Sequence, residues 1–148
     1  MGFLPVDDQL EIISRGTEEV IPLQDLRHKL ESSIKNNKPL VVKLGCDPSR
    51  PDLHIGHSVV LQKLRDFQDL GHQAILVIGD FTAMIGDPSE RNKTRPQLTL
   101  AEAKANAESY IEQSKVILDV KTLKVLFNST WLNKMNFSDV IEMSSKYT

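Results

Sequence analysis

The sequence contains one cysteine, no excess of basic residues and no long apolar run. Cys46 alone cannot form an internal disulfide, and the cysteine and histidines are not spaced as in a structural zinc site, so a reducing, cytoplasmic location is expected. The formal net charge of -2 argues against nucleic-acid binding through bulk positive charge. No apolar stretch reaches the length that crosses a bilayer, and we expect no membrane partner.

Two phosphate-binding motifs are also missing. Neither G-x-G-x-x-G nor G-x-x-x-x-G-K-[ST] follows the first predicted strand, so neither a dinucleotide site nor a P-loop is supported. Any phosphate that the chain binds must therefore be held by other groups.

What the sequence does contain is an alternation of helical and strand patterns. Residues 7–16 and 22–36 are predicted to form two helices, with Pro22 suited to a first helical position. Short apolar runs rich in branched side chains indicate buried strands at 39–45, 73–79 and 123–128.

A helix is predicted between the first two strands, over residues 55–70. Val60, Leu64 and Phe67 share its apolar face, and Gly71 stands where a left-handed cap belongs. The pattern is typical of a helix that packs on a sheet.

The remaining chain is predicted as a polar loop over 80–97 followed by two helices. Thr99 and Glu102 have the spacing of a capping box, and a last helix begins at 137 with Ser138 as its cap. The stripe expected to be buried after Thr99 consists of Ala103, Ala107, Tyr110, Ile111, Ser114, Ile117 and Leu118.

These elements predict an α/β fold, the first half of a Rossmann-like doubly wound parallel sheet preceded by two helices. We expect an N-terminal helical segment over 1–38 and a single, partial Rossmann-like domain over 39–148. A strand order of 3-2-1 would leave residues 40–44 at an exposed apolar edge, which favours self-association. Ligands of such folds bind beyond the carboxyl ends of the strands, where Gly45 and Gly79 lie.

His54 and His57 lie at this ligand edge, at the start of the helix over 55–70. Residues three apart share one side of a helix, so both imidazoles can face one ligand. The helix start supplies unpaired N–H groups that favour an anion, and Gly56 leaves room for a base or a phosphate. The competing interpretation is that both histidines are solvated loop and helix residues.

The residues 54–57, His-Ile-Gly-His, are the signature of the class I aminoacyl-tRNA synthetases. With LGCDPSRPDLHIGHSVVLQKLRDFQDLGH, ILVIGDFTAMIGDPSERNKTRPQLT and FNSTWL, the chain from about Lys43 to Thr148 resembles the amino-terminal catalytic region of the bacterial tyrosyl-tRNA synthetase family. The resemblance implies tyrosine-tRNA ligase activity. ATP, with Mg²⁺ carried by ATP and no metal site on the protein, activates tyrosine to tyrosyl-adenylate, which is transferred to tRNA(Tyr).

The resemblance also implies roles for individual residues. His54 and Ser49 would contact the leaving phosphates, and His57 and Gly56 would hold the nucleoside. The catalytic set would be His54, His57, Arg91 and Arg95; the ATP-binding set Gly45, Asp47, Ser49, His54, Gly56 and His57; and the tyrosine-binding set Asp87, Gly45 and Asp47.

Several of these positions have simpler interpretations. Asp87 and Asp47 each precede a proline and suit a turn, and Gly45 suits the end of a strand. Arg91, Lys93 and Arg95 could clamp pyrophosphate or could form a solvated basic loop. The first strand carries Lys43 where some members of the family bind the phenol with a tyrosine, so phenol recognition must differ.

The second half of the fold, with its Lys-Met-Ser-Lys-Ser loop and the tRNA-binding domain, is absent from these residues. We therefore expect an amino-terminal fragment that binds ATP and tyrosine weakly and is inactive or weak alone. At full length the family relationship implies a homodimer. The alternatives are another H-x-G-H nucleotidyltransferase, or a non-catalytic binding or dimerisation fragment.

Overall fold

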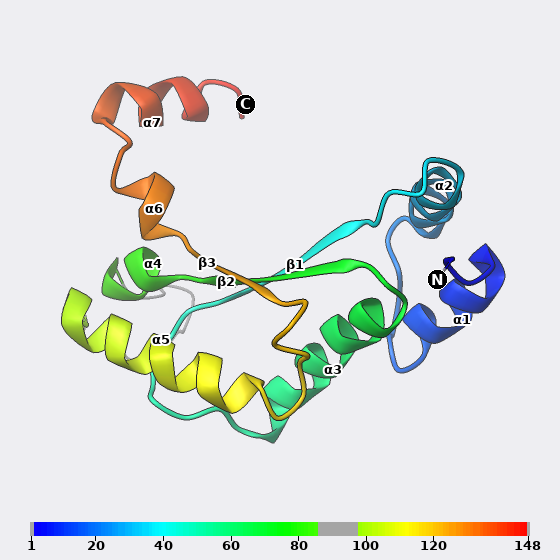
Figure 1. The fold of residues 1–148 in the computed structure, drawn as a ribbon. Coiled ribbons are helices and arrows are strands. Elements are labelled where there is room, and N and C mark those ends of the chain that lie inside the picture. The colour runs from blue at the N-terminus through cyan, green and yellow to red at the C-terminus, as the bar shows by residue number, and fades with distance from the viewer. Residues whose placement is uncertain (1, 86–97, 148) are drawn as a thin grey trace.

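The computed structural model describes residues 2–85 and 98–147 and contains a three-stranded parallel sheet (Figure 1). The strands β1 (Val41–Cys46), β2 (Gln73–Ile78) and β3 (Lys124–Phe127) are arranged in the order β1-β2-β3. This confirms the predicted strands and the α/β fold, and it leaves β1 at an edge of the described sheet.

The three strands end together. Cys46 lies opposite Ile78, and Ile78 lies opposite Phe127, so the last residues of all three strands are neighbours in the sheet. The loops that follow them therefore meet at one edge, as the sequence predicted for a ligand site.

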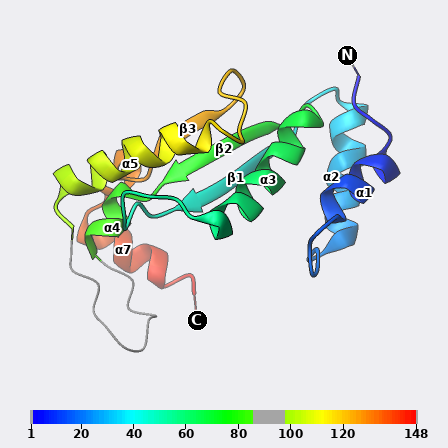
Figure 2. The same cartoon turned by 90° about the horizontal axis from the view of Figure 1, so that it is seen from below.

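Two helices, α3 (Ile55–Asp69) and α5 (Leu100–Ser114), cover one face of the sheet (Figures 1 and 2). Strand residues that point toward these helices are buried, with Ala74, Leu76 and Ile78 at 0% exposure. Since side chains alternate along a strand, the neighbouring residues face the other way.

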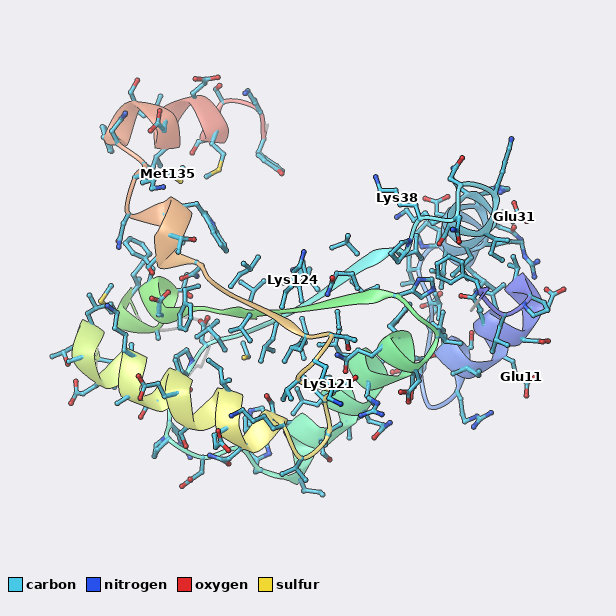
Figure 3. All side chains as sticks on the ribbon, in the orientation of Figure 1. Glu11, Glu31, Lys38, Lys121, Lys124 and Met135 are labelled. Carbon is cyan, nitrogen blue, oxygen red and sulfur yellow. The ribbon has the colours of Figure 1, made fainter. Side chains whose placement is uncertain are left out.

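That second face of the sheet is open within the described residues. Val41 is 66% exposed and Leu126 is 42% exposed, and Lys124 lies on this side of β3 (Figure 3). The open face has a mixed apolar and basic character, because Lys43 and Lys124 are exposed beside the two apolar side chains.

Two helices precede the sheet, α1 (Val6–Ser14) and α2 (Leu23–Lys35), and both lie at the end of the sheet where β1 begins (Figure 2). They share a hydrophobic core with α3, although the division of the chain at residue 38 stays a prediction. The buried members of that core are Leu10, Ile13, Leu30, Phe67 and Leu70.

A buried histidine joins this helical segment to the sheet. His72 is 3% exposed and accepts a hydrogen bond from the Leu40 N–H at Nδ1 over 3.2 Å. Its Nε2 lies 2.8 Å from Gln9 Oε1, and Gln9 Nε2 donates to the Leu4 carbonyl over 2.7 Å. Because Nδ1 accepts, the ring hydrogen is on Nε2 and the imidazole is neutral.

Several details of the predicted helices are wrong. Pro22 is the N-cap of α2 rather than its first residue. On α3 the predicted residues Leu64 and Phe67 are buried, but the third buried residue is Leu61. Val60 is instead 46% exposed and lines a cavity beside the strand ends. The apolar stripe therefore differs from the prediction only at its first position, where Leu61 packs with Leu64, Ala74 and Leu118.

The predicted loop over 80–97 begins with a short helix, α4 (Asp80–Ile85), and residues 86–97 lie outside the described part. Asp80 is 1% exposed, and its carboxylate accepts hydrogen bonds from the Ser129 N–H (3.0 Å) and hydroxyl (2.6 Å). Sequence patterns could not show this helix, since a contact 49 residues away anchors it.

The chain ends in two helices, α6 (Ser129–Leu132) and α7 (Phe137–Ser144). The cap of α7 is Asn136, not Ser138, because Asn136 Oδ1 accepts from the Asp139 N–H and Asp139 reciprocates at the Asn136 N–H. α7 has no buried residue and stands apart from the sheet (Figure 1).

Candidate functional site

A cavity of about 750 Å³ opens at the carboxyl ends of the strands, between the loop over 47–53, the start of α3, and α5. The structure brings five of the predicted site residues to its wall: Gly45, Asp47, Ser49, His54 and His57. Gly56 lies between the two histidines. The other predicted site residues, Asp87, Arg91 and Arg95, lie outside the described residues, as does Lys93.

The two histidines cap α3 reciprocally. His54 is the N-cap, and its Nδ1 accepts from the Gly56 N–H over 3.1 Å. His57 Nδ1 accepts from the His54 N–H over 3.1 Å. A ring nitrogen that accepts a hydrogen bond carries no hydrogen, so both rings carry theirs on Nε2.

This capping leaves Nε2 of each ring as a donor at the cavity. No hydrogen bond within the described residues uses either Nε2 atom, while the ring centroids lie only 4.0 Å apart. His57 also contacts the Tyr110 ring of α5, with centroids 6.0 Å apart. Both rings line the cavity, so each has an N–H donor available to a ligand there.

The helix start is less open to an anion than the sequence indicated. The Gly56 N–H is bonded to the His54 ring, and the His57 N–H donates to the His54 carbonyl over 2.8 Å. A Cβ at Gly56 would lie 2.9 Å from His54 Cε1, which is too close. Glycine at position 56 therefore gives room to the His54 ring, a reason that the sequence alone did not reveal.

Asp47 is held by residues that follow the other two strands, Thr82 on α4 after β2 and Asn128 after β3. Thr82 Oγ1 donates to Asp47 Oδ1 over 2.8 Å, and Asn128 Nδ2 donates to Thr82 Oγ1 over 3.0 Å. Asn128 Oδ1 in turn accepts from the Phe81 N–H over 2.9 Å. This chain of bonds connects the ends of all three strands and fixes the carboxylate beside the cavity.

Gly79 permits this arrangement. A Cβ at this position would overlap Asp47 Oδ1 and would lie 2.5 Å from Thr82 Oγ1. The close approach of β2 to the Asp47 side chain requires glycine there.

Cys46 lies beside Asp47 and is not a nucleophile. Burial, with a further contribution from the Asp47 carboxylate, raises the pKa of the Cys46 thiol to about 11. The thiol is therefore protonated at neutral pH and unreactive.

Sequence reasoning missed three residues at this site, Thr82, Asn128 and Tyr110. Asn128 directly follows β3, so the rule that ligands bind beyond strand ends could have found it. Tyr110 was assigned only to the buried stripe of its helix, yet it lines the cavity. No sequence pattern indicates Thr82.

The described residues hold no cluster of three or more histidine, cysteine, aspartate or glutamate side chains suited to a metal ion. Among the helices of this described part, none is both long and apolar enough to cross a membrane.

A parallel α/β sheet whose first crossover helix starts with a histidine pair beside the strand ends is a Rossmann-like fold of the class I synthetase type. The family model described as tRNA synthetases class I (W and Y) matches residues 35–148. The chain belongs to this family.

Curated relatives point to the tyrosine branch. The chain is 56% identical over 148 residues to the tyrosine–tRNA ligase of Salinibacter ruber, and 60% identical over 148 residues to that of Chlorobaculum tepidum. Each comparison covers 100% of this chain and 36% of the relative. The chain therefore spans about a third of the length of these proteins.

A solved structure agrees with this assignment. The tyrosyl-tRNA synthetase of Archaeoglobus fulgidus, crystallised with L-tyrosine, superposes with a TM-score of 0.74 at 26% identity. The match covers 97% of this chain and 41% of that one.

Proposed function

We propose that this chain forms the ATP- and tyrosine-binding half of a tyrosine-tRNA ligase. The observation that carries the proposal is the reciprocal capping of His54 and His57, which leaves two N–H donors at the cavity. The identity to tyrosine–tRNA ligases over the whole chain supports the choice of substrate.

In the proposed reaction a tyrosine carboxylate oxygen attacks the α-phosphorus of ATP. The bond from that phosphorus to the bridging oxygen breaks, and pyrophosphate leaves with the electron pair. The 3'-terminal adenosine of tRNA(Tyr) then accepts the tyrosyl group, and AMP is released. Mg²⁺ would arrive bound to ATP.

The residues at the cavity would contribute charge stabilisation and positioning rather than a covalent nucleophile. The Nε2–H groups of His54 and His57 would donate to phosphate and nucleoside atoms, and these bonds strengthen as charge develops on the phosphates. Ser49 would join His54 at the leaving phosphates, while Gly45 and Asp47 would line the crevice shared with tyrosine. Asp87, Arg91 and Arg95 keep their proposed roles toward the tyrosine ammonium group and pyrophosphate.

The test is tyrosine-dependent exchange between ATP and pyrophosphate, measured with the product of the complete reading frame. Asparagine at position 54 keeps an N-cap acceptor but does not reach the position of Nε2. We expect His54→Asn to slow exchange by about 10²-fold, the effect of losing one transition-state donor.

The control is His28→Asn, because His28 is exposed on α2 and bonded to Glu31, away from the cavity. This variant should exchange at the wild-type rate. If His54→Asn exchanged as fast as His28→Asn, the histidine pair would have only a structural role. If no amino acid supported exchange by the wild-type protein, the ligase assignment would fall.

We also propose that the full-length protein is a cytoplasmic homodimer that uses the segment after Asn128. The apolar side chains of α7 support this, with Phe137 79% exposed and Ile141 55% exposed. Sedimentation should give twice the monomer mass, and Ile141→Glu should give the monomer mass. A wild-type monomer would contradict the proposal.

A further inference from the structure

The loop over 47–53 carries Asp47 and Ser49 and leads directly into His54, yet it has little backbone bonding of its own. Pro48 and Pro51 have no N–H to donate. Within the described residues the only backbone hydrogen bond inside this loop joins the Ser49 N–H to the Asp47 carbonyl, over 2.8 Å. Side chains from elsewhere therefore contribute to the conformation of the loop.

Two amides of α5 supply those contacts. Gln113 Nε2 donates to the Pro51 carbonyl over 3.0 Å, and Gln113 Oε1 accepts from the Leu53 N–H over 2.9 Å. Asn106 Nδ2 donates to the Pro48 carbonyl over 3.0 Å. Residues seven apart lie on the same side of a helix, so both amides face the loop from one helix.

Gln113 itself is held in place. Its Nε2 also donates to Ser109 Oγ over 2.8 Å, one turn earlier on α5. The side chain is partly buried, and both of its polar atoms are used, so its rotamer is constrained by three hydrogen bonds. A glutamine that is fixed in this way can transmit the position of α5 to the loop.

We propose that Gln113 and Asn106 are positioning residues for ATP binding. They hold the carbonyls of Pro48 and Pro51 and the N–H of Leu53, so that Ser49 and His54 keep their places on the cavity wall. Neither amide contacts the ligand in this role; both act through the loop. The inference rests on the proposed function, since it names the residues that shape the ATP-binding wall.

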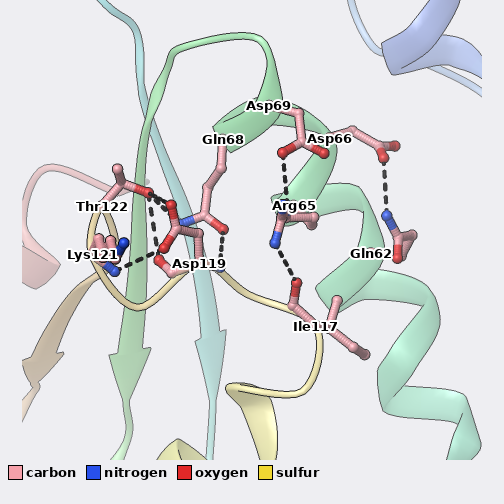
Figure 4. Close-up of polar contacts among 9 residues, drawn as sticks. All are labelled: Gln62, Arg65, Asp66, Gln68, Asp69, Ile117, Asp119, Lys121 and Thr122. Atoms are coloured by element: carbon pink, nitrogen blue, oxygen red, sulfur yellow. Dashed lines mark hydrogen bonds and ion pairs between the residues drawn. The ribbon is translucent and has the colours of Figure 1, made fainter.

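The chain provides a matched control for Gln113: a glutamine that binds a loop away from the cavity. Gln68 on α3 binds the loop before β3 in the same manner (Figure 4). Its Oε1 accepts from the Asp119 N–H over 3.0 Å, and its Nε2 donates to the Asp119 carbonyl (2.9 Å) and to Thr122 Oγ1 (3.0 Å). That loop lies at the amino end of the sheet, opposite the cavity.

The experiment compares Gln113→Met with Gln68→Met in the product of the complete reading frame. Methionine keeps the length of the side chain and removes its hydrogen bonds. The KM values for ATP and tyrosine are measured by pyrophosphate exchange, and hydrogen exchange of the loops is followed by mass spectrometry. We expect Gln113→Met to raise the KM for ATP roughly tenfold, the effect of losing two backbone bonds.

Gln68→Met should leave the KM for ATP within about twofold of wild type, because its hydrogen bonds lie away from the site. Faster hydrogen exchange should be confined to residues 47–54 in Gln113→Met and to the loop before β3 in Gln68→Met. Equal KM values for ATP in the two variants would overturn the inference. If the wild-type protein showed no pyrophosphate exchange, the proposed function would fail separately. The hydrogen bonds from Gln113 to the loop would still be tested, because unaltered hydrogen exchange at residues 47–54 in Gln113→Met would show that Gln113 does not position the loop.

Discussion

Gly79→Ala tests whether the strand ends are built around the Asp47 carboxylate. The added Cβ would overlap Asp47 Oδ1 and would come to 2.9 Å from Asp47 Cγ and 2.5 Å from Thr82 Oγ1. Both neighbours are short side chains joined by a 2.8 Å hydrogen bond, so neither can move without breaking it. Asp47 must therefore rotate away from Thr82.

The cost follows from the contacts that are lost. A hydrogen bond to a charged group contributes about 1.5–3 kcal/mol, and an off-rotamer side chain costs about 0.5–1.5 kcal/mol. We therefore expect Gly79→Ala to lower the free energy of unfolding by roughly 2–4.5 kcal/mol, the sum of these two contributions. Urea denaturation of the chain, followed by circular dichroism, measures this loss.

Gly45→Ala is the matched control, because a Cβ at Gly45 would meet nothing within 4 Å. It should change the free energy of unfolding by no more than about 0.5 kcal/mol. Combining Gly79→Ala with Asp47→Ala should cost less than the sum of the single variants, since the second change removes the obstructing carboxylate. Equal stability of Gly79→Ala and Gly45→Ala would refute the reasoning.

Three further predictions concern stability. Burial lowers the pKa of His72 below its ordinary value, so the unfolded chain binds the proton more tightly. The free energy of unfolding, measured at a series of pH values, should therefore decrease as the pH is lowered below about 6.5. His72→Gln should remove this dependence. Thr99→Ala should cost about 1 kcal/mol in urea denaturation through loss of the α5 cap, whereas the neighbouring Leu100→Ala should cost less. Leu30→Ala, at a side chain with 0% exposure, should cost about 2–5 kcal/mol by the same assay, and a cost below that of exposed Leu23→Ala would contradict the assigned core.

The sequence predicted the elements whose cause is local. The three strands and α3 were found because continuous apolar runs and a helical apolar stripe are visible in neighbouring residues. α4 was missed because its buried Asp80 depends on Ser129, 49 residues away. Val60 was assigned to the core because residues 60 and 61 satisfy the helical period almost equally, and only the packing of Leu61 against Ala74 and Leu118 decides between them.

The candidate site likewise has residues that local sequence features predict and residues that depend on distant contacts. His54 and His57 could be found because their spacing and the adjacent helix start are both local features. The partners that hold the loop and Asp47 could not, since Thr82 is 35 residues from Asp47 and Gln113 is 62 residues from Pro51. A polar residue on an amphipathic helix gives no sign of whether it faces water or a backbone carbonyl.

The histidine spacing itself has a structural cause that is separate from any ligand. N-cap and N3 are the positions at which two side chains can cap a helix reciprocally, and α5 and α7 do so with Thr99 and Glu102, and with Asn136 and Asp139. Those boxes place a carboxylate at N3, which would repel a phosphate. Histidines at 54 and 57 supply the same two acceptors through Nδ1 and leave an N–H donor on each ring. The spacing therefore follows from helix capping, and the choice of histidine over an acid is the feature that indicates an anionic ligand.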